Sequence, residues 1–196
     1  MPATVHISEQ LPRERLLELL DYCPRTGIFT WKYRPDRHAR WNGRFAGKPA
    51  GGIYANGYRY ICIDFVTYKA TRLAWVIMTG YEPPLCVDHI NGITTDDRWE
   101  NLRGATKSQN GANRPKQKNN TSGFKGVSWH SRAKCWVAKI KCRGTHYHLG
   151  CFGTAEEASS AYRSASLKLF GEFSQESLTA FNKRGEAPFS ERGAAI

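Results

Sequence analysis

The sequence predicts a mixed α+β protein built from short strands, tight turns and capped helices. Two Asn-Gly dipeptides, at residues 56–57 and 91–92, favour hairpin turns because both residues tolerate positive φ. Residues 58–64 alternate between two faces, as a half-buried strand does. Capping-box patterns at residues 106–109 and 154–157 each mark the start of a helix that follows strand-like sequence. Hydrophobic residues make up 40% of the chain, which is enough for packed cores.

The charge of the chain indicates an anionic polymer as its partner. The 196 residues include 29 Lys and Arg against 17 Asp and Glu, a formal net charge of +12. No acidic residue lies between Glu100 and Glu156, so every charged side chain of this segment is Lys or Arg. Such a segment favours nucleic acid as the ligand, because its cations can neutralise the phosphates. The cations of this stretch are Arg103, Lys107, Arg114, Lys116, Lys118, Lys125, Arg132, Lys134, Lys139, Lys141 and Arg143.

The N-terminal residues predict a scaffold of short elements. Closely spaced leucines after Pro12 indicate a core-packing helix that Pro24 ends, and Gly80 closes a second, apolar helix. The expected elements are a helix over residues 12–22, strands over residues 27–32, 58–64 and 66–70, and a helix over residues 72–79.

Residues 33–52 form a second basic segment without a regular pattern. Its cations are Arg34, Arg37, Arg40, Arg44 and Lys48, and Trp31, Trp41 and Phe45 are interleaved with them. The composition fits a loop that follows a phosphate backbone or a solvated linker, and the sequence leaves both open.

Residues 85–113 predict the order strand, turn, strand, helix. A short apolar run ends in Asp88 and His89, and a tight turn follows at once. Residues 99–103 form a second extended piece, after which the capped helix begins at Thr106.

The polar residues of this segment suit hydrolysis of a phosphodiester. Histidine titrates near neutrality, so His89 suits proton abstraction from water. The side-chain oxygens of Asp88 and Asn110 suit a hydrated Mg²⁺ that is held partly by substrate phosphate. Asn101 suits ordering of the loop between the strands, because Asn side chains commonly bond backbone groups.

At these residues the chain resembles the HNH endonucleases, in the branch typical of phages and mobile introns. The resemblance implies a ββα-metal fold in which His89 is the general base and Asp88 and Asn110 bind the metal. It assigns loop ordering to Asn101. Asn110 stands where other branches carry His, and an amide ligand favours Mg²⁺ or Mn²⁺ over zinc. The segments that carry the resemblance are Asp88-His89-Ile-Asn-Gly, Asp97-Arg-Trp-Glu-Asn101-Leu-Arg and Ser108-Gln-Asn110-x-x-Asn113.

The predicted function is metal-dependent hydrolysis of double-stranded DNA by a homing-type or phage-encoded endonuclease. His89 would activate water, and Arg103 and Lys107 would hold the phosphate. One such site cuts one strand per engagement, so a monomer is expected to nick, and a double-strand break needs a dimer or a second event. Two alternatives stay open: a sequence-specific DNA-binding regulator with a non-catalytic HNH-like scaffold, and an RNA-directed module.

The C-terminal residues predict a second domain, a three-stranded antiparallel sheet packed on one helix. Strand-like pieces cover residues 124–129, 135–141 and 146–152, and the helix from the second capping box ends at Gly171. The predicted layout is a nuclease domain over residues 1–113 with its motif at 86–113, a basic linker over 114–123, the sheet domain over 124–174 and a tail over 175–196.

The sheet domain resembles the ethylene-response-factor (Apetala-two) type of DNA-binding domain. The resemblance implies a sheet placed in the DNA major groove, with several Lys and His residues where plant members carry Arg. The matching segments are Lys125-Gly-Val, Trp136-x-Ala-x-Ile, His148-Leu-Gly-x-Phe and Ala158-x-x-Ala161-Tyr. The expected DNA-contacting residues are Arg114, Lys116 and Lys118 in the linker, and Lys125, Trp129, Arg132, Lys139, Lys141, His146 and His148 in the domain.

The remaining features concern compartment and cofactors. The N-terminus lacks a signal-peptide pattern and no apolar run approaches transmembrane length, which predicts a cytoplasmic protein of a bacterial or phage-infected cell. The six Cys are scattered and predict reduced thiols, with a structural zinc left open. Mg²⁺ or Mn²⁺ is the one cofactor expected, and we expect neither a small-molecule cofactor nor a membrane partner. The chain is expected to be a monomer, with a dimer left open.

Overall fold

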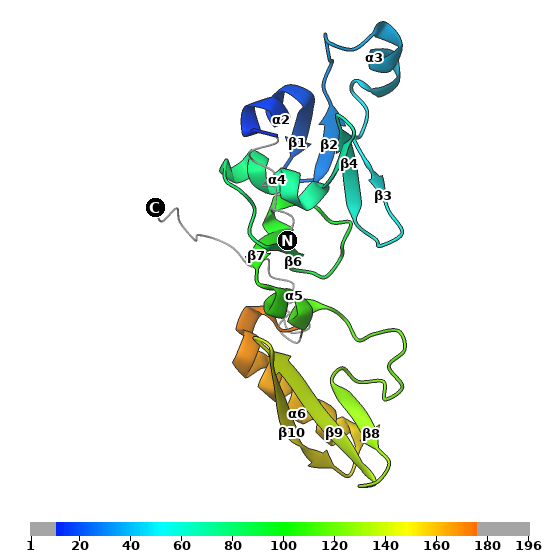
Figure 1. The fold of residues 1–196 in the computed structure, drawn as a ribbon, viewed down its shortest axis with the longest axis vertical. Coiled ribbons are helices and arrows are strands. Elements are labelled where there is room, and N and C mark those ends of the chain that lie inside the picture. The colour runs from blue at the N-terminus through cyan, green and yellow to red at the C-terminus, as the bar shows by residue number, and fades with distance from the viewer. Residues whose placement is uncertain (1–10, 176–196) are drawn as a thin grey trace. The chain divides into compact units, whose positions relative to one another are not determined.

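The computed structural model describes residues 11–175, so the predicted tail after Gln175 and the N-terminal segment lie outside the described part. The chain divides into two compact units, Met1–Gly104 and Ala105–Ile196. Both units mix helices with small antiparallel sheets (Figure 1). None of the helices within residues 11–175 is long and apolar enough to span a bilayer.

The first unit is a series of short elements around one long helix, α4 (Figure 1). Strands β1 and β2 pair with each other. Strands β3, β4 and β5 form a three-stranded sheet, and β6 pairs with β7. The elements are α2 (Arg13–Leu19), β1 (Leu20–Cys23), β2 (Ile28–Trp31), α3 (Ala39–Phe45), β3 (Gly52–Ile53), β4 (Arg59–Ile63), β5 (Val66–Lys69), α4 (Ala70–Thr79), β6 (Cys86–His89), the 3₁₀ turn η1 (Trp99–Asn101) and β7 (Leu102–Ala105).

Two predicted elements of the first unit are wrong in their extent. The helix expected over residues 12–22 ends at Leu19, because Leu20 and Tyr22 pair with β2 and bury alternate side chains there. In the segment expected to extend over residues 99–103, the first three residues form the η1 turn instead of strand.

The segment over residues 33–52, expected to be irregular, contains the helix α3. His38 caps this helix, since its Nδ1 accepts a hydrogen bond of 3.3 Å from the backbone N–H of Trp41. Histidine is not among the preferred N-cap residues, which explains why the start of this helix was not predicted.

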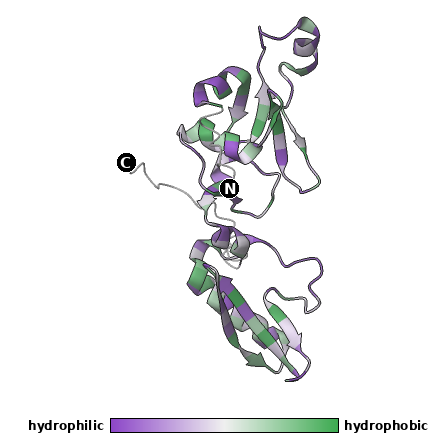
Figure 2. Ribbon diagram, in the orientation of Figure 1, coloured by the Kyte–Doolittle hydropathy of each residue, from purple (hydrophilic) through white to green (hydrophobic). Residues whose placement is uncertain are grey.

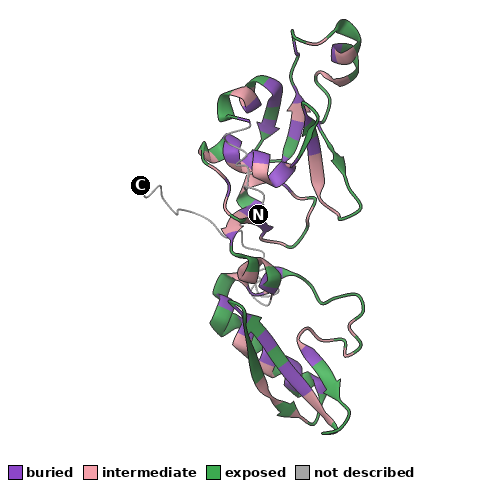
Figure 3. Cartoon of the chain, in the orientation of Figure 1, coloured by how far each residue is buried: buried purple, intermediate pink, exposed green. Residues whose placement is uncertain are grey.

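One hydrophobic core holds the first unit together. Leu73 and Val76 of α4 are fully buried, together with Leu16 of α2 and Ile61 of β4 (Figure 3). Burying one such side chain stabilises the fold by about 1.5–3 kcal/mol. α4 ends as predicted at Gly80, whose φ of 77° places it in the left-handed region that suits glycine.

The second unit is a sheet of order β10-β9-β8 with α6 packed on one face. Hydropathy alternates along β9, where apolar residues face α6 and lysines lie between them (Figure 2). Both predicted capping boxes are present, with Thr106 and Thr154 as N-caps. The elements are α5 (Lys107–Asn113), β8 (Val127–His130), β9 (Cys135–Cys142), β10 (Thr145–Phe152), α6 (Ala155–Phe170) and the 3₁₀ turn η2 (Gly171–Phe173).

The division between the units falls after Gly104, whereas the nuclease domain was expected to extend to Asn113. The physical reason is that α5 packs with the C-terminal elements. Its Ala112 joins a core cluster with Ile140, Tyr162 and Phe170. Helix α5 therefore belongs to the second compact unit.

Candidate active site

The strand β6 places two adjacent polar residues, Asp88 and His89, in buried positions. Asp88 is 5% exposed, and its Oδ2 accepts hydrogen bonds of 3.0 Å from both Nε and Nη2 of Arg103 on β7. A guanidinium that donates two bonds to one carboxylate fixes the orientation of that carboxylate. Arg103, expected to hold phosphate, thus contacts Asp88 in this structure.

His89 is held by a carboxylate that the sequence did not assign to the site. Its Nε2 lies 3.0 Å from Oδ1 of Asp97, and the two residues are 3% and 2% exposed. Within the described residues, Asp97 Oδ2 makes no hydrogen bond, although Arg59 Nε lies 3.7 Å away. A buried carboxylate next to an imidazole fixes the orientation of the ring and which of its nitrogens carries the hydrogen.

Asp97 is itself held in place by the β1–β2 hairpin. The hydroxyl of Tyr22 donates a hydrogen bond of 2.7 Å to the backbone carbonyl of Asp97. Burial, followed by the charge of Asp97, raises the pKa of Tyr22, which keeps its hydroxyl protonated as a donor. Gly27 has a φ of 71°, and a Cβ there would lie 2.4 Å from the carbonyl carbon of Asp97. The hairpin thus approaches Asp97 at a distance that only glycine permits.

Asn101 orders the loop between β6 and β7. Its Oδ1 accepts from the backbone N–H of Asn91 at 2.9 Å, and its Nδ2 donates to the backbone carbonyl of Asp96 at 2.7 Å. Asp96 in turn accepts from Arg98 and Asn91, and the Arg98 guanidinium is the main cause that lowers the pKa of Asp96. These bonds are the kind of contact that the sequence predicts for the middle Asn of the motif.

The second predicted metal ligand, Asn110, lies on α5 in the second unit. Among the described residues, no group of three or more His, Cys, Asp or Glu is arranged to hold a metal ion. A donor set of one carboxylate and one amide still fits Mg²⁺, which keeps several waters and needs few protein ligands. The residues of this chain are therefore chemically suited to a hydrated Mg²⁺ or Mn²⁺.

The second unit carries a basic face on its sheet. Lys139 and Lys141 alternate with the buried residues of β9, and both point away from the face that packs on α6. His148 and His146 of β10 lie directly opposite them, so all four exposed side chains share one surface. We call these four residues the basic face.

The other predicted DNA-contacting residues lie elsewhere in the second unit. Nζ of Lys125 donates to the carbonyl of Ala112 at 2.6 Å and contacts the C-terminal end of α5. Trp129 lies opposite Trp136 with ring centroids 5.2 Å apart, on the other side of the sheet from the basic face. The remaining four of the predicted residues are exposed and lie outside the strands: Arg114, Lys116, Lys118 and Arg132.

Comparisons with known proteins bear on the first unit and on α5. Residues 68–112 match the HNH endonuclease family, which confirms that part of the sequence prediction. The match leaves out the β8–β10 sheet, so its likeness to plant DNA-binding domains stays a prediction. No solved structure matches the chain. "Protein 3.8" of Escherichia phage T7 is 31% identical over 112 residues, which cover 55% of this chain and 92% of the phage protein. The chain therefore carries an HNH endonuclease domain and belongs to one family with Protein 3.8 of phage T7.

Proposed function

We propose that this protein is a metal-dependent DNA endonuclease that nicks one strand of duplex DNA. The HNH endonuclease match implies a nuclease, that is, a phosphodiester hydrolase acting on DNA. The observation that supports the mechanism best is the contact between His89 and Asp97. His89 follows Asp88 directly on strand β6. A buried imidazole that is bonded to a buried carboxylate is held in one orientation, as a general base must be.

In the proposed mechanism His89 is the general base. A carboxylate only accepts hydrogen bonds, so Nε2 carries the hydrogen in the contact with Asp97. The other ring nitrogen, Nδ1, is then the basic atom in the neutral ring, and it removes the proton from the water that attacks phosphorus. Asp97 stabilises the imidazolium that forms, and Tyr22 holds the backbone of Asp97 in position.

Asp88 and Asn110 are the residues that would hold the metal ion. A bound divalent ion supplies electrostatic stabilisation of the charge that develops on the phosphate. Arg103 orients the Asp88 carboxylate through two hydrogen bonds to Oδ2. Lys107, exposed at the start of α5, is the candidate for phosphate contact.

The second unit would hold the enzyme on duplex DNA, with the basic face against the major groove. Its exposed lysines can contact phosphates or guanine edges. The phage T7 relative supports a phage or mobile-element setting in a bacterial cell. Nicking by a monomer follows from a single set of motif residues in the chain.

A second function, a DNA-binding regulator with an HNH scaffold, is favoured by one observation. The Asp88 carboxylate contacts Arg103, and His89 is almost fully buried, as they would be in a framework without chemistry. Such a protein would bind DNA with strong salt dependence and would not cleave it.

The experiment that separates the two functions is plasmid nicking by the full chain with Mg²⁺ or Mn²⁺. Wild type is expected to convert supercoiled plasmid to open circles, and EDTA is expected to stop it. His89→Ala is expected to lose activity by about 10²–10⁴-fold, as for removal of a general base. His89→Gln keeps a donor for Asp97, so its activity loss with an unchanged circular-dichroism melt excludes unfolding as the cause.

Three outcomes would contradict the proposal in different ways. Equal cleavage by wild type and both variants would show that His89 is not the general base. Cleavage that persists in EDTA would show that the reaction does not depend on a divalent metal. Tight DNA binding without cleavage of several plasmids would favour the regulator.

A further inference from the structure

The first unit contains a pocket that the nuclease chemistry does not use. Its volume is about 470 Å³, within the range of roughly 300–1,000 Å³ typical of small-molecule sites. It is formed by β2, α3 and the tip of the β4–β5 hairpin, elements that precede the HNH-matched residues or only touch their start. The residues that matter here are Trp31, Trp41, Phe45, Phe65, Arg37 and Asp64.

The walls of this pocket are aromatic. Trp41 packs edge-on against Trp31 with ring centroids 5.6 Å apart, and its ring centroid lies 5.1 Å from that of Phe45. The guanidinium of Arg34 lies 5.7 Å from the centre of the Trp41 ring. Trp41 and Phe45 are partly exposed, so they retain accessible ring surface.

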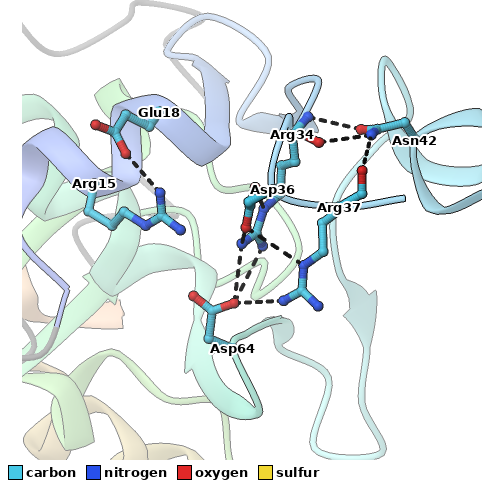
Figure 4. Close-up of polar contacts among 7 residues, drawn as sticks. All are labelled: Arg15, Glu18, Arg34, Asp36, Arg37, Asn42 and Asp64. Atoms are coloured by element: carbon cyan, nitrogen blue, oxygen red, sulfur yellow. Dashed lines mark hydrogen bonds and ion pairs between the residues drawn. The ribbon is translucent and has the colours of Figure 1, made fainter. Parts of the chain in front are cut away.

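A network of ion pairs fixes the polar side of the pocket (Figure 4). Arg34, which is 3% exposed, donates to Asp36 at 2.6 Å and lies 3.4 Å from Asp64. Arg37 Nη2 donates to the same Asp64 oxygen at 2.9 Å. Asn42 of α3 bonds the backbone N–H and carbonyl of Arg34, which ties the helix to the network. The site is therefore ordered before any ligand binds.

One donor of this network is not used within the described residues. Nε of Arg37 is buried and makes no hydrogen bond, and Asp36 Oδ2 lies 3.9 Å away from it. A buried guanidinium N–H without an acceptor is costly. Since Arg37 lines the pocket, an acceptor on a bound molecule would remove that cost.

Phe65 occupies an unfavourable position at the hairpin tip. It is 95% exposed, and both Asp64 and Phe65 have positive φ values, 46° and 68°. The positive φ values belong to the two-residue turn between Ile63 and Val66, because tight hairpin turns of this kind need positive φ at both central positions. Asn, Asp and Gly are the usual residues of such a turn, so a Phe with an almost fully exposed ring is uncommon there. A ligand that packs on the ring would cover this apolar surface.

The charge around the pocket identifies the kind of ligand. Residues 31–52 contain six Lys or Arg and a single acid, Asp36. Arg40, Arg44 and Lys48 are exposed, and the Arg44 guanidinium lies 5.1 Å from the centre of the Phe45 ring. Aromatic walls with a cationic rim match a planar base that carries a phosphate.

We propose that this pocket binds an unstacked nucleobase of single-stranded DNA, with a ring such as Phe65 or Trp41 against the base and the cationic rim on its phosphates. The inference rests on the proposed function in taking DNA as the polymer. An aromatic pocket accepts a base only when the face of that base is free, so the ligand is a single strand or a base turned out of the duplex.

The test measures binding of dT12 to the full chain in EDTA, where no cleavage intervenes. Phe65→Ala is expected to weaken binding at least about fivefold, the smallest effect usual for loss of one base–aromatic stack. Because Phe65 is almost fully exposed, the substitution leaves the fold intact. Tyr81→Ala, which removes another highly exposed ring of the same unit, is the matched control and should bind as wild type.

A second readout uses dT12 with one central 2-aminopurine. Stacking on a protein ring changes the emission of this base, and the change is expected to shrink in Phe65→Ala but not in Tyr81→Ala. The same affinity and the same emission change in wild type and Phe65→Ala would overturn the proposal. Competition by free dTMP as effective as by dT12 would instead assign a mononucleotide site. Tighter binding of rU12, dependent on Phe65, would assign the pocket to RNA.

These outcomes are independent of the nuclease assay. If the protein fails to nick plasmid but Phe65→Ala weakens dT12 binding, the proposed base-binding pocket is supported and the proposed endonuclease activity is contradicted. If the protein nicks plasmid and Phe65→Ala leaves dT12 binding unchanged, the endonuclease activity is supported and the base-binding pocket is contradicted.

Discussion

The candidate active site and the basic face represent opposite ways of placing polar groups. Asp88, His89, Asp97 and Asn101 are all buried, and hydrogen bonds hold each of them to a fixed neighbour. The basic face of the second unit is exposed on strands whose other side packs on α6. Chemistry requires groups that are oriented before the substrate arrives, whereas polymer binding requires charges that remain accessible.

The difference also predicts how each region responds to substitution. A buried polar group that loses its partner leaves an unsatisfied atom, which costs about 1–3 kcal/mol. An exposed lysine that is removed changes little in the folded chain but weakens contacts with phosphate. Substitutions in the first region should therefore alter stability or catalysis, and those in the second should alter binding alone.

The largest effect is expected for Asn101→Ala. The substitution leaves the backbone N–H of Asn91 and the carbonyl of Asp96 without their partner. Two such losses should lower the free energy of unfolding of the first unit by about 2–4 kcal/mol. Urea unfolding followed by tryptophan fluorescence measures this, and a change below about 0.5 kcal/mol would show that the loop does not depend on Asn101.

The next largest effect is expected for Asp97→Asn. The amide is nearly the same size but cannot stabilise an imidazolium, and its NH₂ group can reverse the hydrogen bond to Nε2. Nicking should fall about 10- to 100-fold, as for other groups that orient a catalytic side chain, while DNA affinity is kept. Asp21→Asn, at an exposed position of β1, is the control for loss of an acid. Wild-type nicking by Asp97→Asn would remove Asp97 from the mechanism.

The basic face should respond through binding. Replacing Lys139 and Lys141 together by Ala removes two exposed charges without touching the α6 side of the sheet. If both contact phosphate, the slope of log affinity against log salt should become shallower by about 2, one for each lysine. Nicking at saturating DNA should be unchanged. An unaltered slope, measured by fluorescence anisotropy at several salt concentrations, would place the DNA on another surface.

The sequence predicted best what depends on neighbours in the chain. The capping boxes at Thr106 and Thr154 and the left-handed end of α4 at Gly80 are local features, and the structure contains all three. The loop-ordering contacts of Asn101 span only five and ten residues. Residue type and local spacing are enough for such features.

The contacts that the sequence missed depend on distant segments. Asp97 meets His89 because Tyr22 and Gly27, some seventy residues earlier, hold its backbone. Asp97 is the first residue of one segment that carries the HNH resemblance, and this was the one signal for it; its spacing from His89 does not predict their contact. The helix expected over residues 12–22 failed for the same reason, since pairing with β2 outweighed the helical preference of its leucines.

The smallest effect is expected for Thr154→Ala. This substitution tests whether the loss of a hydrogen-bonded side chain also lowers the stability of the second unit. Thr154 Oγ1 accepts a hydrogen bond of 3.2 Å from the backbone N–H of Glu157, and Glu157 Oε2 accepts one from the backbone N–H of Thr154. Loss of this N-cap should lower the free energy of unfolding of the second unit by about 1 kcal/mol. Thr121→Ala, at an exposed loop position, is the control and should stay within about 0.5 kcal/mol of wild type. Because α6 supports the sheet from behind, the salt slope of DNA binding should be unchanged in Thr154→Ala; a shallower slope would mean that the cap and the basic face are coupled.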